Sequence, residues 1–126
     1  MNYLFDTHAL LWAISDPPKL GKAVRRVLEG RGHVFYASAA SAWEIAIKVG
    51  LGKLDFPIDD LAAALSDAQF AELPITLAHA VGVRSLPPHH LDPFDRLLVA
   101  QALAEGLVRI TRDEALAAYK VSTLWD

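Results

Sequence analysis

The 126-residue sequence contains no cysteine, which excludes both disulfide bonds and thiolate metal sites. No uninterrupted apolar stretch approaches the length of a transmembrane helix, so no membrane partner is expected. Because the first predicted strand begins almost at Met1, we also expect no signal peptide. Linkers, internal repeats and low-complexity tracts are missing as well. We therefore expect one domain over residues 1–126 in a soluble, cytoplasmic protein.

A surplus of positive charge is missing too. The formal net charge of −3 disfavours binding to a polyanion, so global charge gives no argument for nucleic acid. A hydrophobic content of 53 % and a charged content of 21 % exclude a disordered chain. Any contact with phosphate must therefore come from local basic groups or from a bound cation.

Short apolar runs separated by turn residues predict strands that alternate with helices. The expected strands are residues 2–6, 33–37, 71–74, 107–111 and 121–124. The expected helices lie at about 8–14, 20–30, 39–49, 59–69, 77–85, 93–106 and 112–119, with Ser38, Thr76 and Asp92 as N-caps. This alternation predicts an α/β fold with a parallel sheet and helices on both faces.

Four acidic residues stand where a carboxylate would meet the edge of the buried core: Asp6, Glu44, Asp95 and Asp113. Asp6 ends one predicted strand and Asp113 follows another, and the carboxyl ends of parallel strands share one crevice. Converging carboxylates repel one another unless a cation or a proton intervenes. Hard oxygen ligands without cysteine suit Mg²⁺ or Mn²⁺. The sequence therefore predicts a divalent metal site formed by these four acids.

Each acid also has a purely structural explanation. Asp6 could end a strand or cap the next helix, and Asp95 and Asp113 would be favourable in first helical turns. Glu44 could pair with Lys48 one helical turn later. Taken together these explanations weaken, because an otherwise apolar helix should not bury a carboxylate without a partner.

Several neighbouring side chains could assist such a site. Thr7 and Thr111 could orient a carboxylate or a water, with helix capping as the alternative. Arg96 and Arg112 each adjoin one of the acids and are candidates to face a scissile phosphate, with a solvated surface arginine as the alternative. Lys48 is a further supporting residue, because it could pair with Glu44.

The histidines form no spaced set of metal ligands. His8 lies near Asp6 and could reach the site. The other four, His33, His79, His89 and His90, are expected at the surface or in loops. The three tryptophans are expected in the core or at an interface.

Four ordered blocks resemble the PIN-domain ribonucleases, especially the VapC-like toxins of bacterial type II toxin–antitoxin pairs. The blocks are Leu4-Phe5-Asp6-Thr7-His8, Ser41-Ala42-Trp43-Glu44-Ile45 with Lys48, Asp92-Pro93-Phe94-Asp95-Arg96, and Thr111-Arg112-Asp113. The resemblance implies a three-layer α/β/α sandwich with a mostly parallel five-stranded sheet. It also implies an acidic site with one or two Mg²⁺ or Mn²⁺ ions and endonucleolytic cleavage of RNA by metal-activated water.

Carried over by position, the four acids are the metal-binding and catalytic residues, and Thr111 is the hydroxyl beside the last of them. Asp92 resembles a cap more than a ligand, and Glu114 stands where many relatives carry proline. The resemblance further implies a homodimer and a cognate antitoxin that enters the active-site groove. RNA is the implied substrate.

Three other functions are considered on sequence grounds. A receiver-like phosphoacceptor domain would suit the length, but it requires paired acids after the first strand, where Asp6 stands alone. A phosphatase of the haloacid-dehalogenase type would need a second acid at the position of His8. A catalytically silent PIN scaffold would be favoured by the loss of one of the four acids, and none is lost.

Overall fold

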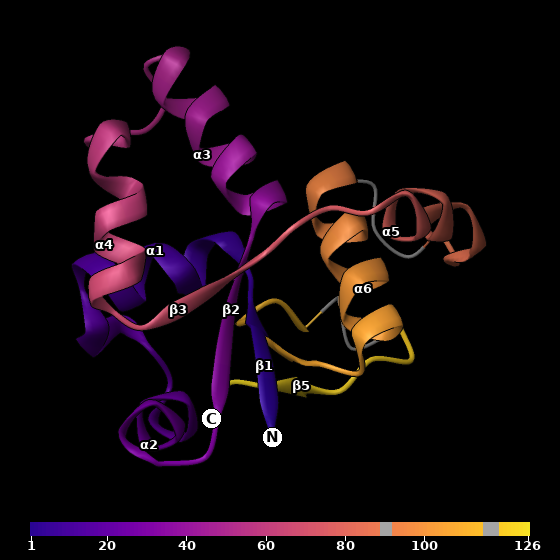
Figure 1. The fold of residues 1–126 in the computed structure, drawn as a ribbon, viewed down its shortest axis with the longest axis horizontal. Coiled ribbons are helices and arrows are strands. Elements are labelled where there is room, and N and C mark those ends of the chain that lie inside the picture. The colour runs from indigo at the N-terminus through magenta and orange to yellow at the C-terminus, as the bar shows by residue number, and fades with distance from the viewer. Residues whose placement is uncertain (89–91, 115–118) are drawn as a thin grey trace.

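The sheet of this protein is built from five short parallel strands (Figure 1). A computed structural model describes residues 1–88, 92–114 and 119–126. The strands are β1 (Asn2–Phe5), β2 (Val34–Ser38), β3 (Phe70–Leu73), β4 (Val108–Ile110) and β5 (Thr123–Leu124). Their order across the sheet is β3-β2-β1-β4-β5, and every neighbouring pair is parallel. The predicted parallel sheet is confirmed. Strands β1, β4 and β5 are shorter than predicted, and β2 and β3 are shifted by one residue.

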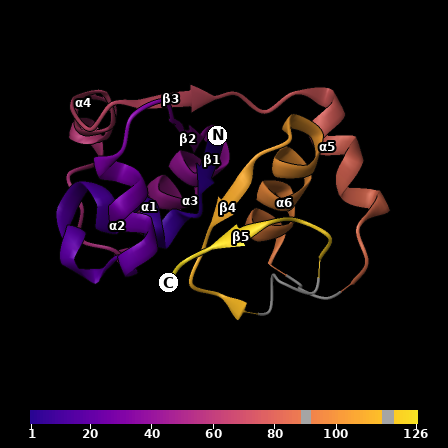
Figure 2. The same cartoon turned by 90° about the horizontal axis from the view of Figure 1, so that it is seen from below.

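Helices cover both faces of this sheet (Figures 1 and 2). They are α1 (Thr7–Ser15), α2 (Lys22–Glu29), α3 (Ala39–Gly50), α4 (Leu61–Asp67), α5 (Leu77–Gly82) and α6 (Pro93–Glu105), with short 3-10 turns η1 (Pro17–Lys19), η2 (Ile58–Asp60) and η3 (Val83–Ser85). Among the described ranges, no helix combines the length and apolar character that crossing a bilayer would require.

Strand β1 divides the core between the two helical layers, because successive side chains of a strand point to opposite faces. Tyr3 and Phe5 belong to the cluster that contains residues of α1 and α2. Leu4 lies in a second cluster with Leu98 and Ala102 of α6. The three-layer α/β/α sandwich is therefore confirmed.

The strand order reverses between β1 and β4. From β1 the chain adds β2 and β3 on one side, and it then returns to add β4 and β5 on the other. A crevice at the carboxyl ends of the strands is expected at such a reversal. The order also differs from the 2-1-3-4-5 order of receiver domains. The receiver-like alternative is wrong for this reason.

Local capping chemistry fixes several helix starts. The side chain of Ser38 accepts a hydrogen bond from Ala40 N at 3.0 Å. The Asp92 carboxylate accepts from Phe94 N at 2.8 Å, and Pro93 occupies the first turn of α6. Gly106 ends that helix in the left-handed conformation (φ 66°). These caps agree with the sequence predictions.

Other boundaries differ from the predictions. Residues 58–60 form a 3-10 turn, and α4 begins only at Leu61 without a side-chain cap. The helix that Thr76 caps ends at Gly82 and continues as the 3-10 turn η3. Part of the helix predicted for residues 112–119 lies outside the described residues.

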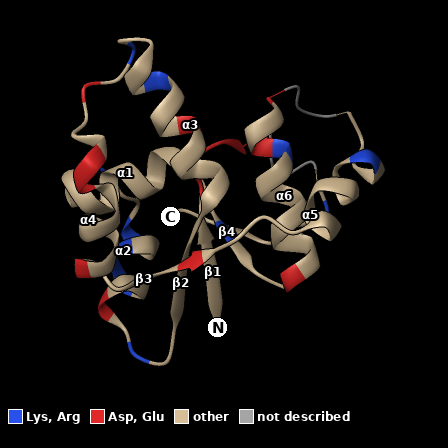
Figure 3. Ribbon diagram, turned by 45° about the horizontal axis from the view of Figure 1, so that its top comes forward, with Lys and Arg blue, Asp and Glu red and all other residues tan. Residues whose placement is uncertain are grey.

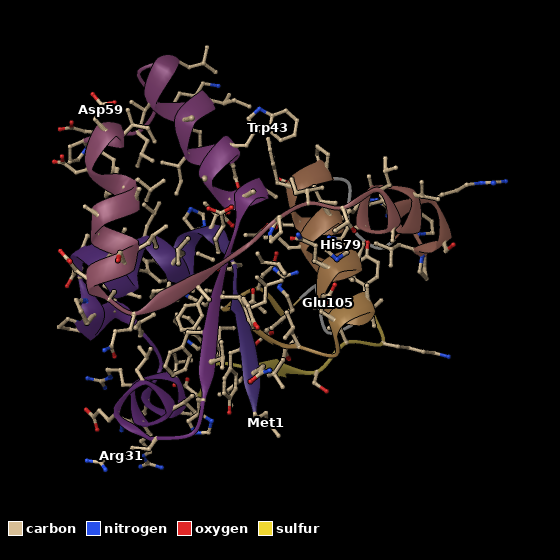
Figure 4. All side chains as sticks on the ribbon, in the orientation of Figure 1. Met1, Arg31, Trp43, Asp59, His79 and Glu105 are labelled. Atoms are coloured by element: carbon tan, nitrogen blue, oxygen red, sulfur yellow. The ribbon has the colours of Figure 1, made fainter. Side chains whose placement is uncertain are left out.

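His79 is buried, not at the surface as the sequence suggested. Its backbone N donates to Thr76 Oγ1 at 3.2 Å, and its Nδ1 accepts from Thr76 N at 3.1 Å. On the other side of the ring, Nε2 lies 3.0 Å from Glu105 Oε1, which joins α5 to α6 (Figure 4). Histidine at this capping position replaces the usual Glu or Gln, so the polarity of the residue type was misleading. His89 and His90 lie outside the described residues.

Gly21 is required by the close approach of the C-terminal segment. A Cβ added to Gly21 would lie 2.1 Å from the carbonyl oxygen of Trp125. The backbone of Trp125 cannot move away from a Cβ atom as easily as a flexible side chain could. We therefore expect Gly21→Ala to lower the free energy of unfolding by about 1–3 kcal/mol. Urea unfolding of both proteins measures this. Gly50→Ala is the matched control: nothing lies within 4 Å of the added Cβ, and stability should stay equal or rise by up to about 1 kcal/mol. Equal stability of the two variants would contradict the clash.

Candidate active site at the carboxyl end of the sheet

Asp6 lies at the point where β1 passes into α1. Its backbone N donates to Ile110 O of β4 at 2.9 Å, and its Oδ1 accepts from Ala9 N at 2.8 Å. The residue is 8 % exposed. Asp6 is thus the N-cap of α1, as its structural explanation required, and it also stands beside the strand reversal between β1 and β4.

Glu44 is held against the start of α1 although it belongs to α3. Its Oε1 accepts from Thr7 Oγ1 at 2.6 Å, and its Oε2 accepts from Lys48 Nζ at 2.8 Å. The residue is only 7 % exposed. Ser41, one turn earlier on α3, also faces Thr7, with 3.1 Å between the hydroxyl oxygens. Both partners of Glu44 therefore come from polar residues that the sequence analysis had singled out.

Lys48 connects Glu44 with the start of α6 electrostatically. The hydrogen bond to Glu44 raises the pKa of Lys48, burial opposes this effect, and the charges of Glu44, Asp92 and Asp95 raise the pKa further. A raised lysine pKa stabilises the fold below the ordinary value of 10.5, and this contribution is lost only as pH rises through the folded-state pKa. The pairing is therefore at full strength at neutral pH.

Asp95 and Asp113 complete the acidic set from α6 and from the segment after β4. Asp95 lies half-buried in the first turn of α6, where its N donates to Asp92 Oδ1 at 3.1 Å. Asp113 is exposed, and its N donates to Thr111 Oγ1 at 3.1 Å. The hydroxyl of Thr111 therefore fixes the backbone that carries Asp113.

Arg109 is the residue of this region that the sequence analysis missed. It is fully buried in β4, opposite Leu4 of β1, and its Nη1 makes a long contact of 3.5 Å to the carbonyl oxygen of Asp95. Its Nε and Nη2 have no hydrogen-bond partner among the described residues. A charged residue inside the apolar run at 107–111 was the available signal.

The charge of Arg109 links three of the four acids. Burial lowers the pKa of Arg109, and the charges of Asp6, Asp95 and Asp113 act against that lowering. A guanidinium stays protonated in proteins, so it is a permanent cation beneath these carboxylates. Arg109 therefore supplies part of the positive charge that converging acids require.

The four acids thus lie at one end of the sheet. Glu44 is bound to Thr7 beside Asp6, and Asp113 lines one cavity with Asp6. The carbonyl oxygen of Asp95 contacts Arg109 of β4, which pairs with β1. Figure 3 shows acidic residues, in red, on α3 and at the start of α6 near this end. Their oxygen donors have the chemistry that Mg²⁺ and Mn²⁺ prefer. As they are placed, however, no three Asp, Glu or His side chains within the described ranges form a ready set of metal ligands.

Arg96 has a structural task that differs from the one expected. Its Nη1 donates to Pro87 O at 3.0 Å and its Nη2 donates to Val83 O at 3.1 Å. Nη1 also donates to the hydroxyl of Tyr119 at 3.3 Å. The side chain thus ties the η3 segment to α6, and a role at the scissile phosphate finds no support in these contacts.

Arg112 and His8 lie in an open cavity of about 420 Å³ together with Asp6, Trp12 and Asp113. Both Arg112 and His8 are exposed, whereas Trp12 is half-buried. The cavity therefore places one basic side chain and two rings directly beside two of the acids.

Comparison with known proteins agrees with this geometry. A family model described as PIN domain matches residues 3–121. The structure of VapBC2 from Rickettsia felis bound to promoter DNA is similar with a TM-score of 0.75 and 16 % identity, covering 100 % of both chains. DNA-bound VapBC from Salmonella typhimurium gives 0.71 and 12 % identity over 98 % of this chain and 97 % of that one. VapBC-5 from Mycobacterium tuberculosis gives 0.62 and 20 % identity over 98 % and 95 %. No curated protein matches by sequence.

These findings confirm the resemblance that the four sequence blocks carried. The family match covers the chain from β1 to Val121, and the sandwich matches the fold of VapBC-type structures over nearly the full length. With its acids at the carboxyl end of a sheet ordered β3-β2-β1-β4-β5, the chain belongs to the PIN-domain family.

Proposed function

We propose that this protein is a Mg²⁺- or Mn²⁺-dependent endoribonuclease that acts in the cytoplasm as the toxin of a toxin–antitoxin pair. The observation that carries the proposal is that three acids from separate elements, Asp6, Asp95 and Asp113, act on the buried Arg109 at the strand reversal. The fourth acid, Glu44, is bound to Thr7 directly after Asp6. Membership of the PIN-domain family supports the same conclusion.

Asp6, Glu44 and Asp95 would hold the divalent ion, and Asp113 would hold a second ion or orient the attacking water. When bound, such an ion acidifies water and neutralises charge on the phosphate and on the leaving oxygen. The carboxylates would have to move closer together around it, because their present spacing forms no ligand set among the described residues. A bound cation would also offset the repulsion between this acidic region and RNA.

We further propose that a cognate antitoxin restrains the protein and that the protein forms a homodimer. Structural neighbours at low identity are VapBC and FitAB complexes, whose names pair the two components. Co-purification with the product of an adjacent gene would support the partner, and light scattering measures the oligomeric state.

Cleavage of single-stranded RNA by the purified protein tests the function directly. We expect fragments with 5′-phosphate and 3′-hydroxyl ends in Mg²⁺ or Mn²⁺, loss of cleavage in EDTA, and recovery when the ion is restored. Sequencing of the fragments would identify the target at the same time.

Undiminished cleavage in EDTA would overturn the metal-dependent mechanism. A folded protein that cleaves no RNA with either ion would instead favour the silent PIN scaffold. One feature points in that direction: both oxygens of Glu44 already accept hydrogen bonds, from Thr7 and Lys48.

A further inference from the structure

A stack of aromatic rings forms one wall of the cavity beside Asp6. His8 and Trp12 are one helical turn apart on α1, so their side chains share a face of that helix. Their ring centroids are 5.9 Å apart and the ring planes differ by 21°. Trp12 also contacts Trp125, with 5.7 Å between centroids, and packs against the core cluster of β1, α1 and α2. The Trp12 ring is therefore fixed in place, whereas His8 is exposed.

A guanidinium completes this wall. The Cζ atom of Arg112 lies 5.9 Å from the centroid of the Trp12 ring, a cation–π distance. Arg112 is exposed and borders the same cavity, so its donors can reach a bound molecule. The carboxylates of Asp6 and Asp113 border the cavity as well. One concavity thus combines two rings, one guanidinium and two of the proposed catalytic acids.

From this combination we propose that the cavity is a subsite for one nucleobase of a single-stranded RNA, next to the phosphodiester that is cut. The inference rests on the proposed function and extends it to the way in which the substrate is recognised. His8 and Trp12 offer ring faces on which an unpaired base stacks, and Arg112 contacts the adjoining sugar–phosphate backbone.

General principles of RNA recognition support this assignment. Proteins recognise single-stranded RNA by stacking splayed bases on aromatic rings and on arginine planes. The cavity volume of about 420 Å³ lies within the usual range for small-ligand sites, roughly 300–1,000 Å³. Paired bases of a helix hide their faces, so this subsite selects unpaired nucleotides.

A purely structural explanation would account for Trp12 but not for the whole arrangement. Trp12 and Trp125 pack against the core and need no ligand. His8 and Arg112 are exposed, so they add little to the core, yet both line the same cavity as the acids. The experiment must therefore measure recognition of a base and not stability alone.

A double-mutant cycle makes this measurement by combining the removal of a ring from the protein with the removal of a base from the RNA. The protein carries Asp95→Asn to prevent cleavage, and Asp95 does not line this cavity. The probe is a fluorescent nine-residue oligoribonucleotide in Mg²⁺, intact or with one abasic residue at each successive position. We expect one position at which loss of the base weakens binding by roughly 5- to 150-fold, the effect of one stacked base.

The variants show whether that base stacks on this wall. In His8→Ala and in Trp12→Leu, removal of the base at the sensitive position should weaken binding much less, because the ring on which that base stacks is already lost. We call this loss of affinity on removal of the base the penalty. Trp12→Phe keeps a ring and should keep most of the penalty. Trp43→Leu is the matched control, because Trp43 of α3 (Figure 4) is 57 % exposed, contacts Phe94 and does not line this cavity. The penalty in this control should equal that of the protein with Asp95→Asn alone.

Distinct results would overturn each hypothesis. An unchanged penalty in His8→Ala, whose exposed ring can be removed without loss of core packing, would overturn the subsite. So would the absence of any oligonucleotide binding. RNA cleavage by the wild-type protein together with an unchanged penalty leaves the nuclease function and removes the subsite. If the variants show the expected coupling but the wild-type protein cleaves no RNA, the base-binding subsite is retained and the nuclease function is overturned.

Discussion

Asp6→Asn is expected to reduce RNA cleavage roughly 10³-fold or more while the fold stays intact, because several kcal/mol of transition-state stabilisation depend on the ion that this carboxylate would hold. The substitution separates the two roles of Asp6. Asparagine caps a helix about as well as aspartate, so the hydrogen bond from Ala9 N is retained. Only the negative charge and one hard oxygen ligand are lost. Single-turnover cleavage of a defined RNA measures the effect.

Stability should respond in the opposite direction to activity. Asp6, Asp95 and Asp113 all act on the one guanidinium of Arg109, so three negative charges oppose one positive charge. Removing one of them relieves repulsion, and the thermal midpoint in EDTA should hold or rise. Such opposition is expected where a strained active site limits stability.

Asp60→Asn is the matched control for this prediction. It makes the same chemical change at an exposed carboxylate that makes no side-chain cap hydrogen bond at the start of α4. Cleavage by the control should equal that of the wild type, and Asp95→Asn should behave like Asp6→Asn. Full activity of Asp6→Asn and Asp95→Asn would remove both residues from the proposed metal site.

The parts of the fold that sequence predicted are those that local chemistry determines. Ser38, Thr76 and Asp92 cap their helices through neighbours two or three residues away, so the sequence holds all the partners of each cap. The start of α4 was misplaced because Asp60 offered the right residue type but makes no side-chain cap. Residue type gives a preference for the start of a helix, and tertiary packing decides where the helix begins.

In the candidate active site, the contrast between what local sequence predicts and what tertiary structure decides is larger. The four acids stood out because a carboxylate in an apolar run is costly to bury without a partner. The contacts of these acids could not be read in the same way: Thr7 was a candidate, but it meets Glu44 across 37 positions of the sequence. Arg109 was missed, and it meets Asp95 only because β4 pairs with β1 opposite Leu4. Likewise, His79 of α5 has a partner in Glu105 of α6, 26 residues later in the sequence. Such long-range contacts follow from strand order and register, which no local motif contained.

Arg109→Met should be the most destabilising of these substitutions in the absence of divalent ions. Replacing a complete buried ion pair with apolar groups can be neutral, but removing one partner alone costs about 3–5 kcal/mol. Arg109→Met is closer to the second case, because the charges of Asp6, Asp95 and Asp113 act on Arg109 and remain when the guanidinium is removed. Methionine fills much of the volume, so a cavity contributes little to the loss. Urea unfolding in EDTA measures the free energy of unfolding.

Two further measurements separate this electrostatic explanation from a packing defect. Mn²⁺ should recover part of the lost stability, since an ion that binds only the folded state stabilises it by mass action. In the double variant with Asp6→Asn, the loss should be smaller than the sum of the single effects, because one repelling charge is gone. Arg25→Met, at an exposed position of α2, is the control and should change little. Strict additivity with Asp6→Asn and no response to Mn²⁺ would show that Arg109 acts through packing alone, and the acids would then need another explanation for gathering at this end of the sheet.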